Sequence, residues 1–470
     1  MAGALRVVIP CDTFAPDING AARFAERLAG GLVRRGHEVH IIAPAFDSSE
    51  GPRIEHHDGV NMIVHRLRSH RVPQHRTLRW PEPWGMTKKI SEVLKEVEPH
   101  AVHIQSHLMV GRFALRAAKK LNLRTLATNH VMPENLMRYS LLPKFLHKFA
   151  MRVIWADAGR ILRKMDALTT PTKRAAELLE EAAGVTDVLA ISCGIDASRF
   201  ANQTPTQNAN PVALFLGRLD DEKKIDVFLR AVAQLTDFPN LRVELVGDGG
   251  ERERLQKLAE SLKIASRVSF LGHVTDDELP GIYERATVFV MPSIAELQSI
   301  ATMEAMASGR PVIAADAMAL PHLVHDGDNG YLFPPGDVEA LAERLRRVLA
   351  ADQKELSRLS ENSLHLIQSH DIQRTLGIFE DLYRGVGEPA PTTDDNKPAY
   401  MLPIGRLNDS VRERLLEWRG DALALRSRAE ELTREARERL EDARDELRGQ
   451  LSDLRKEVSK QAKKLRRRKD

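Results

Sequence analysis

Short apolar runs separated by helix-length segments recur along most of the chain, and this alternation limits the fold more than any other feature. A first series predicts strands at Arg6–Pro10, Glu38–Ala43, Val60–Arg66, Ala101–Gln105, Arg124–Thr128 and Ala167–Thr170. A second series predicts strands at Val212–Leu216, Arg242–Val246, Val268–Leu271, Thr287–Met291 and Val312–Ala314. Strands of this kind, linked by helices, form parallel sheets that are covered on both faces.

The two series divide the chain of 470 residues into two α/β halves. We expect one Rossmann-like domain over residues 1–203 and a second over 204–388, facing each other across a ligand cleft. The last helix of the second domain, predicted at 373–385, is expected to pack back on the first domain. A linker over 389–405 and a charged helical tail over 406–470 complete the predicted organisation.

Composition narrows the classes of partner and compartment. A net charge of only +3 gives no reason to expect nucleic acid as a partner. The two cysteines, Cys11 and Cys193, are far apart and fit a reducing compartment. No apolar run approaches the ~20 residues of a membrane-spanning helix, and the N-terminus is typical of a first strand rather than a signal peptide. We therefore expect a cytoplasmic protein whose contact with the inner face of the plasma membrane is peripheral.

Glu296 and Glu304 stand eight positions apart between a predicted strand and the helix that follows it. A strand, a short loop and a helix aim free backbone N–H groups at an anion. A carboxylate accepts hydrogen bonds from sugar hydroxyls but does not bind phosphate. The segment therefore predicts a pocket for a sugar linked to a phosphate.

Two other turns point to the same ligand. Gly20 opens the first helix directly after the first strand, where a glycine lets the backbone approach a phosphate. The dinucleotide fingerprint G-x-G-x-x-G is absent there, which argues against a nicotinamide enzyme. Arg218 and Lys223 follow the first strand of the second half, and fixed cations stabilise the charge that develops on a departing diphosphate.

Taken together, E-x7-E and Gly217-Arg218-Leu219-Asp220-Asp221-Glu222-Lys223 resemble the motifs of retaining GT-B glycosyltransferases, family 4 or group 1, over about residues 4–388. The resemblance implies a GT-B fold in which Glu296 and His130 contact the donor sugar and Glu304 holds the ribose. It assigns the pyrophosphate to Gly20, Arg218, Lys223 and the loop Leu297, Gln298, Ser299 and Ile300. Gly247 and the turn of His273 and Val274 complete the implied donor site, with the latter turn at the base. His107 is a weaker candidate than His130.

One departure from the family pattern leaves the donor open. Many relatives have Glu-Gly-aromatic-Gly where this chain has Glu296-Leu297-Gln298-Ser299. The missing glycines change which loop amides can approach the sugar, so UDP-hexose and GDP-hexose both remain candidates.

No metal or other cofactor is predicted. Asp326-Gly327-Asp328 matches the D-x-D pattern that holds a divalent ion in other glycosyltransferases, but in the GT-B family this loop is structural. The cations Arg218 and Lys223 are expected to neutralise the phosphates instead, and no Cys/His cluster has zinc spacing.

The segment from Arg138 to Lys164 interleaves cations with aromatic residues, which suits an anionic membrane surface. Arg138, Lys144, Lys148 and Arg152 are the predicted membrane-facing cations. The alternative is a helix that packs on the first domain with solvated charges. Diacylglycerol glucosyltransferases and phosphatidylinositol mannosyltransferases, which the chain resembles here, dock through this domain, which implies a lipid acceptor.

The tail over 406–470 repeats its apolar positions every 11 residues and carries 20 Lys and Arg against 15 Asp and Glu. That period keeps one apolar stripe on a nearly straight helix. Self-association as a coiled coil and tethering to a membrane through the polybasic end are equally supported.

The sequence thus predicts a retaining hexosyltransferase that moves glucose or mannose from UDP or GDP to a membrane lipid such as diacylglycerol or a glycolipid. The alternatives are a transferase with a small-molecule or polysaccharide acceptor, a nucleotide-sugar epimerase, and a scaffold with an inert cleft.

Overall fold

The computed structural model describes residues 3–17, 19–47, 49–71, 79–130, 146–200 and 210–386. The predicted linker 389–405, the predicted tail 406–470 and two of the predicted membrane-facing cations, Arg138 and Lys144, lie outside the described residues. Among the described helices, none carries an apolar stretch of the length that a bilayer-spanning helix needs.

The first half of the chain builds a sheet whose strand order is β10-β9-β8-β7-β1-β2-β4-β3. Neighbouring strands pair in parallel, except that β3 pairs with β4 in the antiparallel direction. The strands are β1 (Arg6–Pro10), β2 (Glu38–Pro44), β3 (Gly51–His57), β4 (Val60–Leu67), β7 (Ala101–Ile104), β8 (Arg124–Thr128), β9 (Ala167–Thr170) and β10 (Leu189–Ala190). A separate hairpin joins β5 (Ser69–Arg71) to β6 (Arg79–Pro81).

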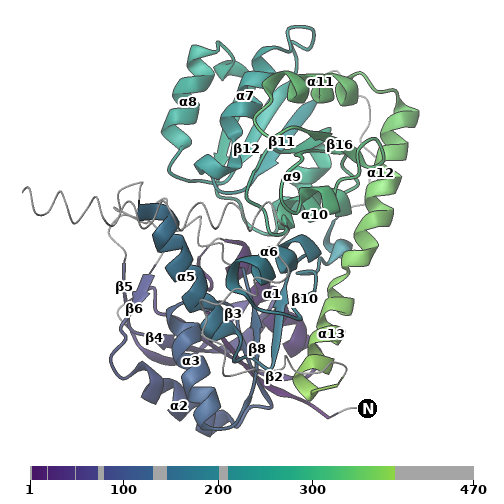
Figure 1. Cartoon of the computed structure of the whole chain (residues 1–470). Coiled ribbons are helices and arrows are strands. Elements are labelled where there is room, and N and C mark those ends of the chain that lie inside the picture. Colours follow the sequence, from purple (N-terminus) through teal and green to yellow (C-terminus); the bar gives the residue numbers. More distant parts are fainter. Residues whose placement is uncertain are drawn as a thin grey trace, which may run out of the picture. The chain divides into compact units, whose positions relative to one another are not determined.

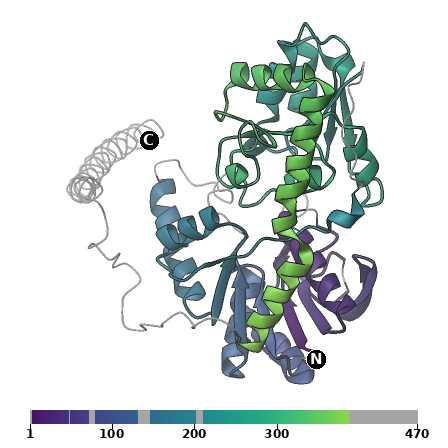
Figure 2. The same ribbon diagram turned by 90° about the vertical axis from the view of Figure 1, so that its right-hand side faces the viewer.

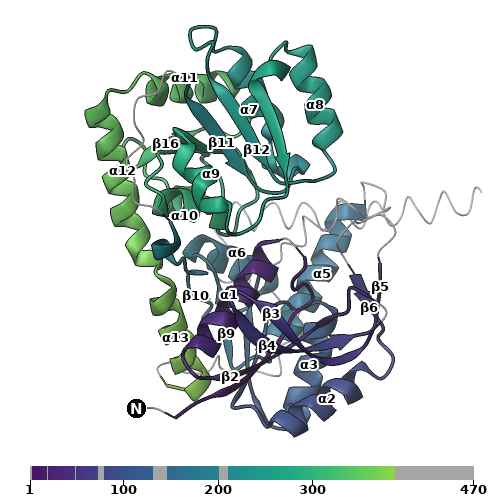
Figure 3. The same ribbon diagram turned by 180° about the vertical axis from the view of Figure 1, so that it is seen from behind.

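Alternate residues of the central strands enter different cores. On β1, Val7 and Ile9 pack in the cluster that includes α1 (Gly20–Arg34) and α13 (Ile372–Arg384). Val8 belongs to a second cluster. Figure 3 shows helices on both sides of this sheet. That second cluster is covered by α2 (Met86–Val97), α3 (Met109–Lys120), α5 (His147–Leu162) and α6 (Lys173–Ala183). Burial of both faces explains why these strands read as unbroken apolar runs.

The second half builds a six-stranded, wholly parallel sheet in the described residues, with the order β13-β12-β11-β14-β15-β16. Figure 1 labels β11, β12 and β16 of this sheet. Its strands are β11 (Val212–Leu216), β12 (Arg242–Val246), β13 (Val268–Gly272), β14 (Val288–Met291), β15 (Val312–Ala315) and β16 (Gly330–Phe333). Its helices are α7 (Ile225–Ala233), α8 (Arg252–Ser261), α9 (Leu279–Arg285), α10 (Ile300–Ala307), α11 (Val338–Leu349) and α12 (Gln353–Ile367). The two parallel, Rossmann-like sheets are those that the sequence predicted.

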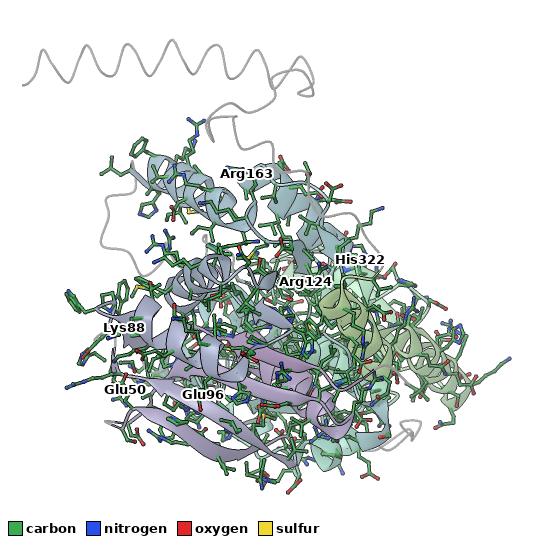
Figure 4. All side chains as sticks on the ribbon, turned by 90° about the horizontal axis from the view of Figure 1, so that it is seen from below. Glu50, Lys88, Glu96, Arg124, Arg163 and His322 are labelled. Carbon is green, nitrogen blue, oxygen red and sulfur yellow. The ribbon has the colours of Figure 1, made fainter. Side chains whose placement is uncertain are left out.

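Helix α13 follows α12 in the sequence and packs against the first half (Figure 2). The Tyr383 hydroxyl lies 2.8 Å from Nδ1 of the buried His103. The guanidinium of Arg124, labelled in Figure 4, donates to the Leu382 carbonyl at 2.6 Å. Helix α13 therefore contacts β7 and β8 of the first sheet.

Strand β3 was not predicted. Its residues alternate between partly buried and exposed along its whole length, because it is an edge strand with one free face. An edge strand of this kind has no apolar run that a sequence pattern can detect.

Both sheets reverse their strand order beside their first strand. In the first sheet β1 lies between β7 and β2, and in the second β11 lies between β12 and β14. At such a switch point the neighbouring connections diverge, and ligands bind beside the carboxyl ends of the strands. The loops after β1, β7, β11 and β14 are therefore where a site is expected.

Candidate active site

The loop after β11 presents the two predicted cations. It ends in a short 3-10 helix, Asp221–Lys223. The Arg218 guanidinium contacts the Asp220 carboxylate and donates to Glu222 Oε1 at 2.8 Å. These acceptors hold the partly exposed Arg218 in one orientation.

Lys223 forms the central contact of the site. Its ammonium donates to Glu296 Oε1 at 2.5 Å, and only 14% and 11% of the two side chains are exposed. The loop after β14 reaches this position because the N–H of Ile294 donates to the Glu222 carbonyl at 3.0 Å. The cation predicted for phosphate and the carboxylate predicted for sugar thus lie side by side.

The predicted pyrophosphate loop runs into α10. Ser299 caps this helix, and its hydroxyl accepts from the N–H of Thr302 at 3.3 Å. First-turn N–H groups of a helix have no partner within the helix, and the Ile300 N–H is one of them. The Gln298 side chain is committed elsewhere, since its Oε1 accepts from the Cys193 N–H at 2.7 Å. The Leu297 carbonyl accepts from the Thr172 hydroxyl at 3.0 Å.

Glu304 lies on α10 and is 3% exposed. One of its oxygens accepts from Arg27 at 2.6 Å and the other from the Tyr283 hydroxyl at 3.0 Å. Burial and the Glu304 carboxylate together raise the pKa of Tyr283 well above its usual value, so the hydroxyl stays protonated. Burial alone would lower the pKa of Arg27, but the Glu304 carboxylate, together with Asp276 and Asp58, outweighs it and the pKa is raised.

Arg27 was not among the predicted site residues. It lies on α1, and its Nη1 is buried without a hydrogen-bond partner in the described residues. The remaining donor capacity lies beside the carboxylate that is predicted to hold the ribose. No local pattern separates Arg27 from the other arginines of α1, because its partner is 277 positions away.

The glycine turns of the second half pack on one another. A Cβ on Gly247 would lie 2.0 Å from the Gly217 carbonyl oxygen, and Gly247 has φ +121°. The Gly247 N–H donates to the Gly272 carbonyl at 2.7 Å. Gly247 therefore joins the loops of β11, β12 and β13. After Gly272, His273 is exposed and Val274 is partly buried against the core.

The first half contributes Gly20 and His130. Gly20 begins α1, whose cap Asn19 accepts from the Ala22 N–H at 2.9 Å, and a Cβ on Gly20 would meet nothing within 4 Å. His130 follows β8, and its Nε2 lies 3.2 Å from Gln105 Oε1. Burial lowers the pKa of His130 to about 3, so the ring is neutral near pH 7. Burial likewise lowers the pKa of His107 to about 4.

The carboxylates of the D-x-D loop bond to neighbouring elements, β16 and α12. Asp326 accepts from the Leu332 N–H at 2.8 Å, and Asp328 accepts from the Asn362 amide at 2.6 Å. Across the described ranges, no group of three His, Cys, Asp or Glu side chains is placed to hold a metal ion.

Two family descriptions match the chain in tandem. "Glycosyltransferase Family 4" matches residues 18–199, and "Glycosyl transferases group 1" matches residues 196–365. Together they take in the first sheet apart from β1, the whole second sheet, and the segments that carry Glu296 and Glu304.

Individual proteins agree with this assignment. The GDP-mannose-dependent alpha-mannosyltransferase of Mycobacterium tuberculosis is 31% identical, over 75% of this chain and 93% of that protein. The alpha-monoglucosyldiacylglycerol synthase of Acholeplasma laidlawii is 25% identical, over 70% and 85%. The solved sucrose-phosphate synthase of Thermosynechococcus elongatus shares the fold, with a TM-score of 0.67 and 21% identity over 81% and 98%.

The two sheets, with their loops at the switch points, define a GT-B glycosyltransferase. The chain belongs to glycosyltransferase family 4, the group 1 glycosyltransferases. It is accordingly a nucleotide-sugar-dependent enzyme that transfers a sugar.

The Arg27–Glu304 pair predicts a large effect on stability. Replacing Arg27 by Met leaves the Glu304 carboxylate buried without its cation, which typically costs about 3–5 kcal/mol. The matched control is Arg23→Met, because Arg23 lies one turn earlier on α1 and pairs with Asp276 at 2.6 Å, with both side chains more exposed than those of the Arg27 pair. Such a pair contributes about 1 kcal/mol or less. Calorimetry should show a clearly larger fall in Tm for Arg27→Met, and equal falls would contradict the buried pairing.

Proposed function

We propose that this enzyme is a retaining hexosyltransferase that moves glucose or mannose from a UDP- or GDP-sugar to a membrane lipid such as diacylglycerol or a glycolipid. The observation that carries the reaction is the buried pair of Lys223 and Glu296 at the carboxyl ends of β11 and β14. It sets a phosphate-binding cation against a sugar-binding carboxylate.

In this proposal the donor lies across the loops of the second half. Arg218 and Lys223 stabilise the charge on the departing diphosphate, and the amides of Leu297 to Ile300 contribute further donors. Glu296 and His130 orient the hexose, while Glu304 holds the ribose. Gly20, Gly247, His273 and Val274 are assigned to the donor as well, with the last two beside the base.

In this proposal the acceptor hydroxyl attacks the anomeric carbon of the sugar on the same face from which the diphosphate leaves. The configuration at that carbon is therefore retained. No carboxylate other than Glu296 is assigned to the sugar, and Glu296 is paired with Lys223. We therefore assign the proton of the acceptor hydroxyl to the departing phosphate oxygen. With two cations at the pyrophosphate, we propose that the reaction needs no metal ion.

Helix α5 supports a membrane acceptor. Leu146, Phe149 and Val153 follow one another at helical spacing along one face and are 37%, 65% and 52% exposed. Lys148 and Arg152 are exposed beside them. The other side of the helix packs on α6, where Arg163, labelled in Figure 4, donates to the Gly184 carbonyl at 3.1 Å. We call Leu146, Phe149, Val153, Lys148 and Arg152 the α5 stripe.

Exposed apolar residues flanked by cations are typical of a helix that lies on an anionic lipid surface. Trp80 and Trp84, 56% and 81% exposed, add aromatic rings of the kind that anchor at such interfaces. The synthase of Acholeplasma laidlawii carries diacylglycerol in its name, in keeping with a lipid acceptor. We accordingly place the enzyme on the cytoplasmic face of the plasma membrane.

The principal alternative is a transferase with a small-molecule or polysaccharide acceptor, for which the donor site would be unchanged. A nucleotide-sugar epimerase would turn over the donor without any acceptor. The tail over 406–470 is proposed to self-associate or to add a second contact to the membrane.

Lys223 and its neighbour Lys224 offer a matched test of the donor site. Lys223→Gln should lower kcat for sugar transfer by about 100-fold to 1000-fold, because the leaving diphosphate loses a fixed charge. Lys224→Gln should have little effect, since Lys224 pairs with the exposed Asp221. Transfer rates are measured with UDP-glucose and GDP-mannose after calorimetry confirms that each variant is folded. Similar rates for the two variants would remove Lys223 from the site.

Flotation with vesicles tests the membrane proposal. The wild type should float with phosphatidylglycerol vesicles and less with phosphatidylcholine. Lys148→Glu with Arg152→Glu should weaken binding by about tenfold or more, since each cation near an anionic surface contributes about 1 kcal/mol. Phe149→Ser with Val153→Ser should weaken it on both lipids. The control is Ile54→Ser, because Ile54 is 76% exposed on the edge strand β3. Flotation that is insensitive to all four substitutions would favour the soluble acceptor.

A further inference from the structure

Gln105 is a buried glutamine at the switch point of the first sheet whose amide is only half used. It follows β7 directly and is 2% exposed. Its Oε1 lies 3.2 Å from His130 Nε2, whereas its Nε2 is buried without a partner among the described residues. Burying an amide N–H without a partner is unfavourable. Folding alone therefore does not account for a glutamine at this position.

The loop that carries Gln105 is held firmly. The backbone N–H of Gln105 donates to the Pro10 carbonyl at 3.0 Å, which fixes the loop to the end of β1. The next residue, Ser106, donates its hydroxyl to Asp12, which also accepts from the Val110 N–H at 2.7 Å. A Cβ on Gly111 would lie 1.8 Å from the Ser106 carbonyl oxygen, so α3 packs directly on this loop. The Gln105 amide therefore has little freedom to find another partner within the protein.

His130 is neutral in this setting. Its ring packs on Phe24 with ring centres 4.9 Å apart, and burial lowers its pKa to about 3. The nearby titratable ring is His103, which is bonded to Tyr383 and Thr128 and whose pKa is likewise lowered to about 3, by burial and by His130. A neutral imidazole carries one hydrogen, and an amide oxygen only accepts. The hydrogen therefore lies on Nε2, which leaves Nδ1 of His130 as an acceptor.

We propose that Gln105 binds the transferred hexose and positions His130 for it. The amide oxygen of Gln105 holds His130 with its hydrogen on Nε2, so that Nδ1 accepts a hydrogen bond from one hydroxyl of the sugar. The amide nitrogen of Gln105 donates to the oxygen of a neighbouring hydroxyl. One acceptor and one donor side by side match the two hydroxyls of a neutral sugar, each of which both donates and accepts. The inference rests on the proposed function, because it needs the sugar to lie beside His130.

The first test compares nucleotide sugars with bare nucleotides. Gln105→Leu should lower the affinity for UDP-glucose or GDP-mannose by about tenfold, the usual effect of one lost hydrogen bond in a polar site. The affinity of Gln105→Leu for UDP or GDP should equal that of the wild type, because in this proposal Gln105 does not contact the nucleotide. Titration calorimetry measures all four ligands. Equal losses for sugar and bare nucleotide, or no loss for either, would overturn the inference.

The second test observes the imidazole itself. Nitrogen-15 NMR of histidine-labelled protein, with the His130 signals assigned by their loss in His130→Gln, reports which ring nitrogen carries the hydrogen. The wild type should show Nε2–H, and Gln105→Leu should show a mixture of the two tautomers. A wild-type Nδ1–H tautomer would overturn the inference. If Gln105→Leu does not fold, Gln105→Asn replaces it, since its shorter side chain cannot reach His130.

Two controls separate the inference from the function on which it rests. Gln234→Leu alters a glutamine of the second half that bonds Glu339 on the surface, and should change no affinity. If His130→Gln leaves the affinity for nucleotide sugars intact, the proposed sugar contact of His130 itself is wrong. If His130→Gln weakens that affinity and Gln105→Leu does not, only the role of Gln105 fails.

Discussion

The contact between the Lys223 ammonium and the Glu296 carboxylate fixes the geometry on which the rest of the site depends. The two residues follow β11 and β14, which pair in parallel, so their loops leave the sheet at one edge. Both side chains are largely buried, and an ion pair held out of water keeps a defined geometry. A ligand that offers a phosphate to the cation and hydroxyls to the carboxylate finds both partners already placed. Preorganised charge of this kind is how an enzyme stabilises a leaving group without rearranging solvent.

The second carboxylate extends the site toward the first half of the chain. Glu304 is held by Arg27 of α1 and by Tyr283 of α9, so both of its oxygens are oriented by contacts within the protein. Helix α13 packs on the first half as well, through Tyr383 and the Leu382 carbonyl. Glu304 therefore links α1 of the first half to α9 and α10 of the second half. The two halves that Glu304 links are also matched by two separate family descriptions, one for each half.

Much of the fold was predictable, because strands buried on both faces must be apolar throughout. The antiparallel edge strand β3 was not, since only one of its faces is covered. Within the site, Glu296, Glu304 and Lys223 stand in local motifs whose spacing is visible in the sequence. Arg218 and Glu222, which form a hydrogen bond, are only four positions apart in the sequence, so this contact is local as well. Arg27 and Gln105 escaped prediction because their partners are distant in sequence. Only the folded chain shows that each has a donor without a partner among the described residues.

The most direct test of the central claim is the shift in Tm caused by UDP and by GDP, each with and without magnesium. A ligand that binds only the folded protein raises its Tm by mass action. We expect stabilisation by one nucleotide, unchanged by magnesium and abolished in Lys223→Gln. Stabilisation that requires magnesium would contradict the assignment of the phosphates to Arg218 and Lys223. No stabilisation by either nucleotide would contradict the donor site as a whole.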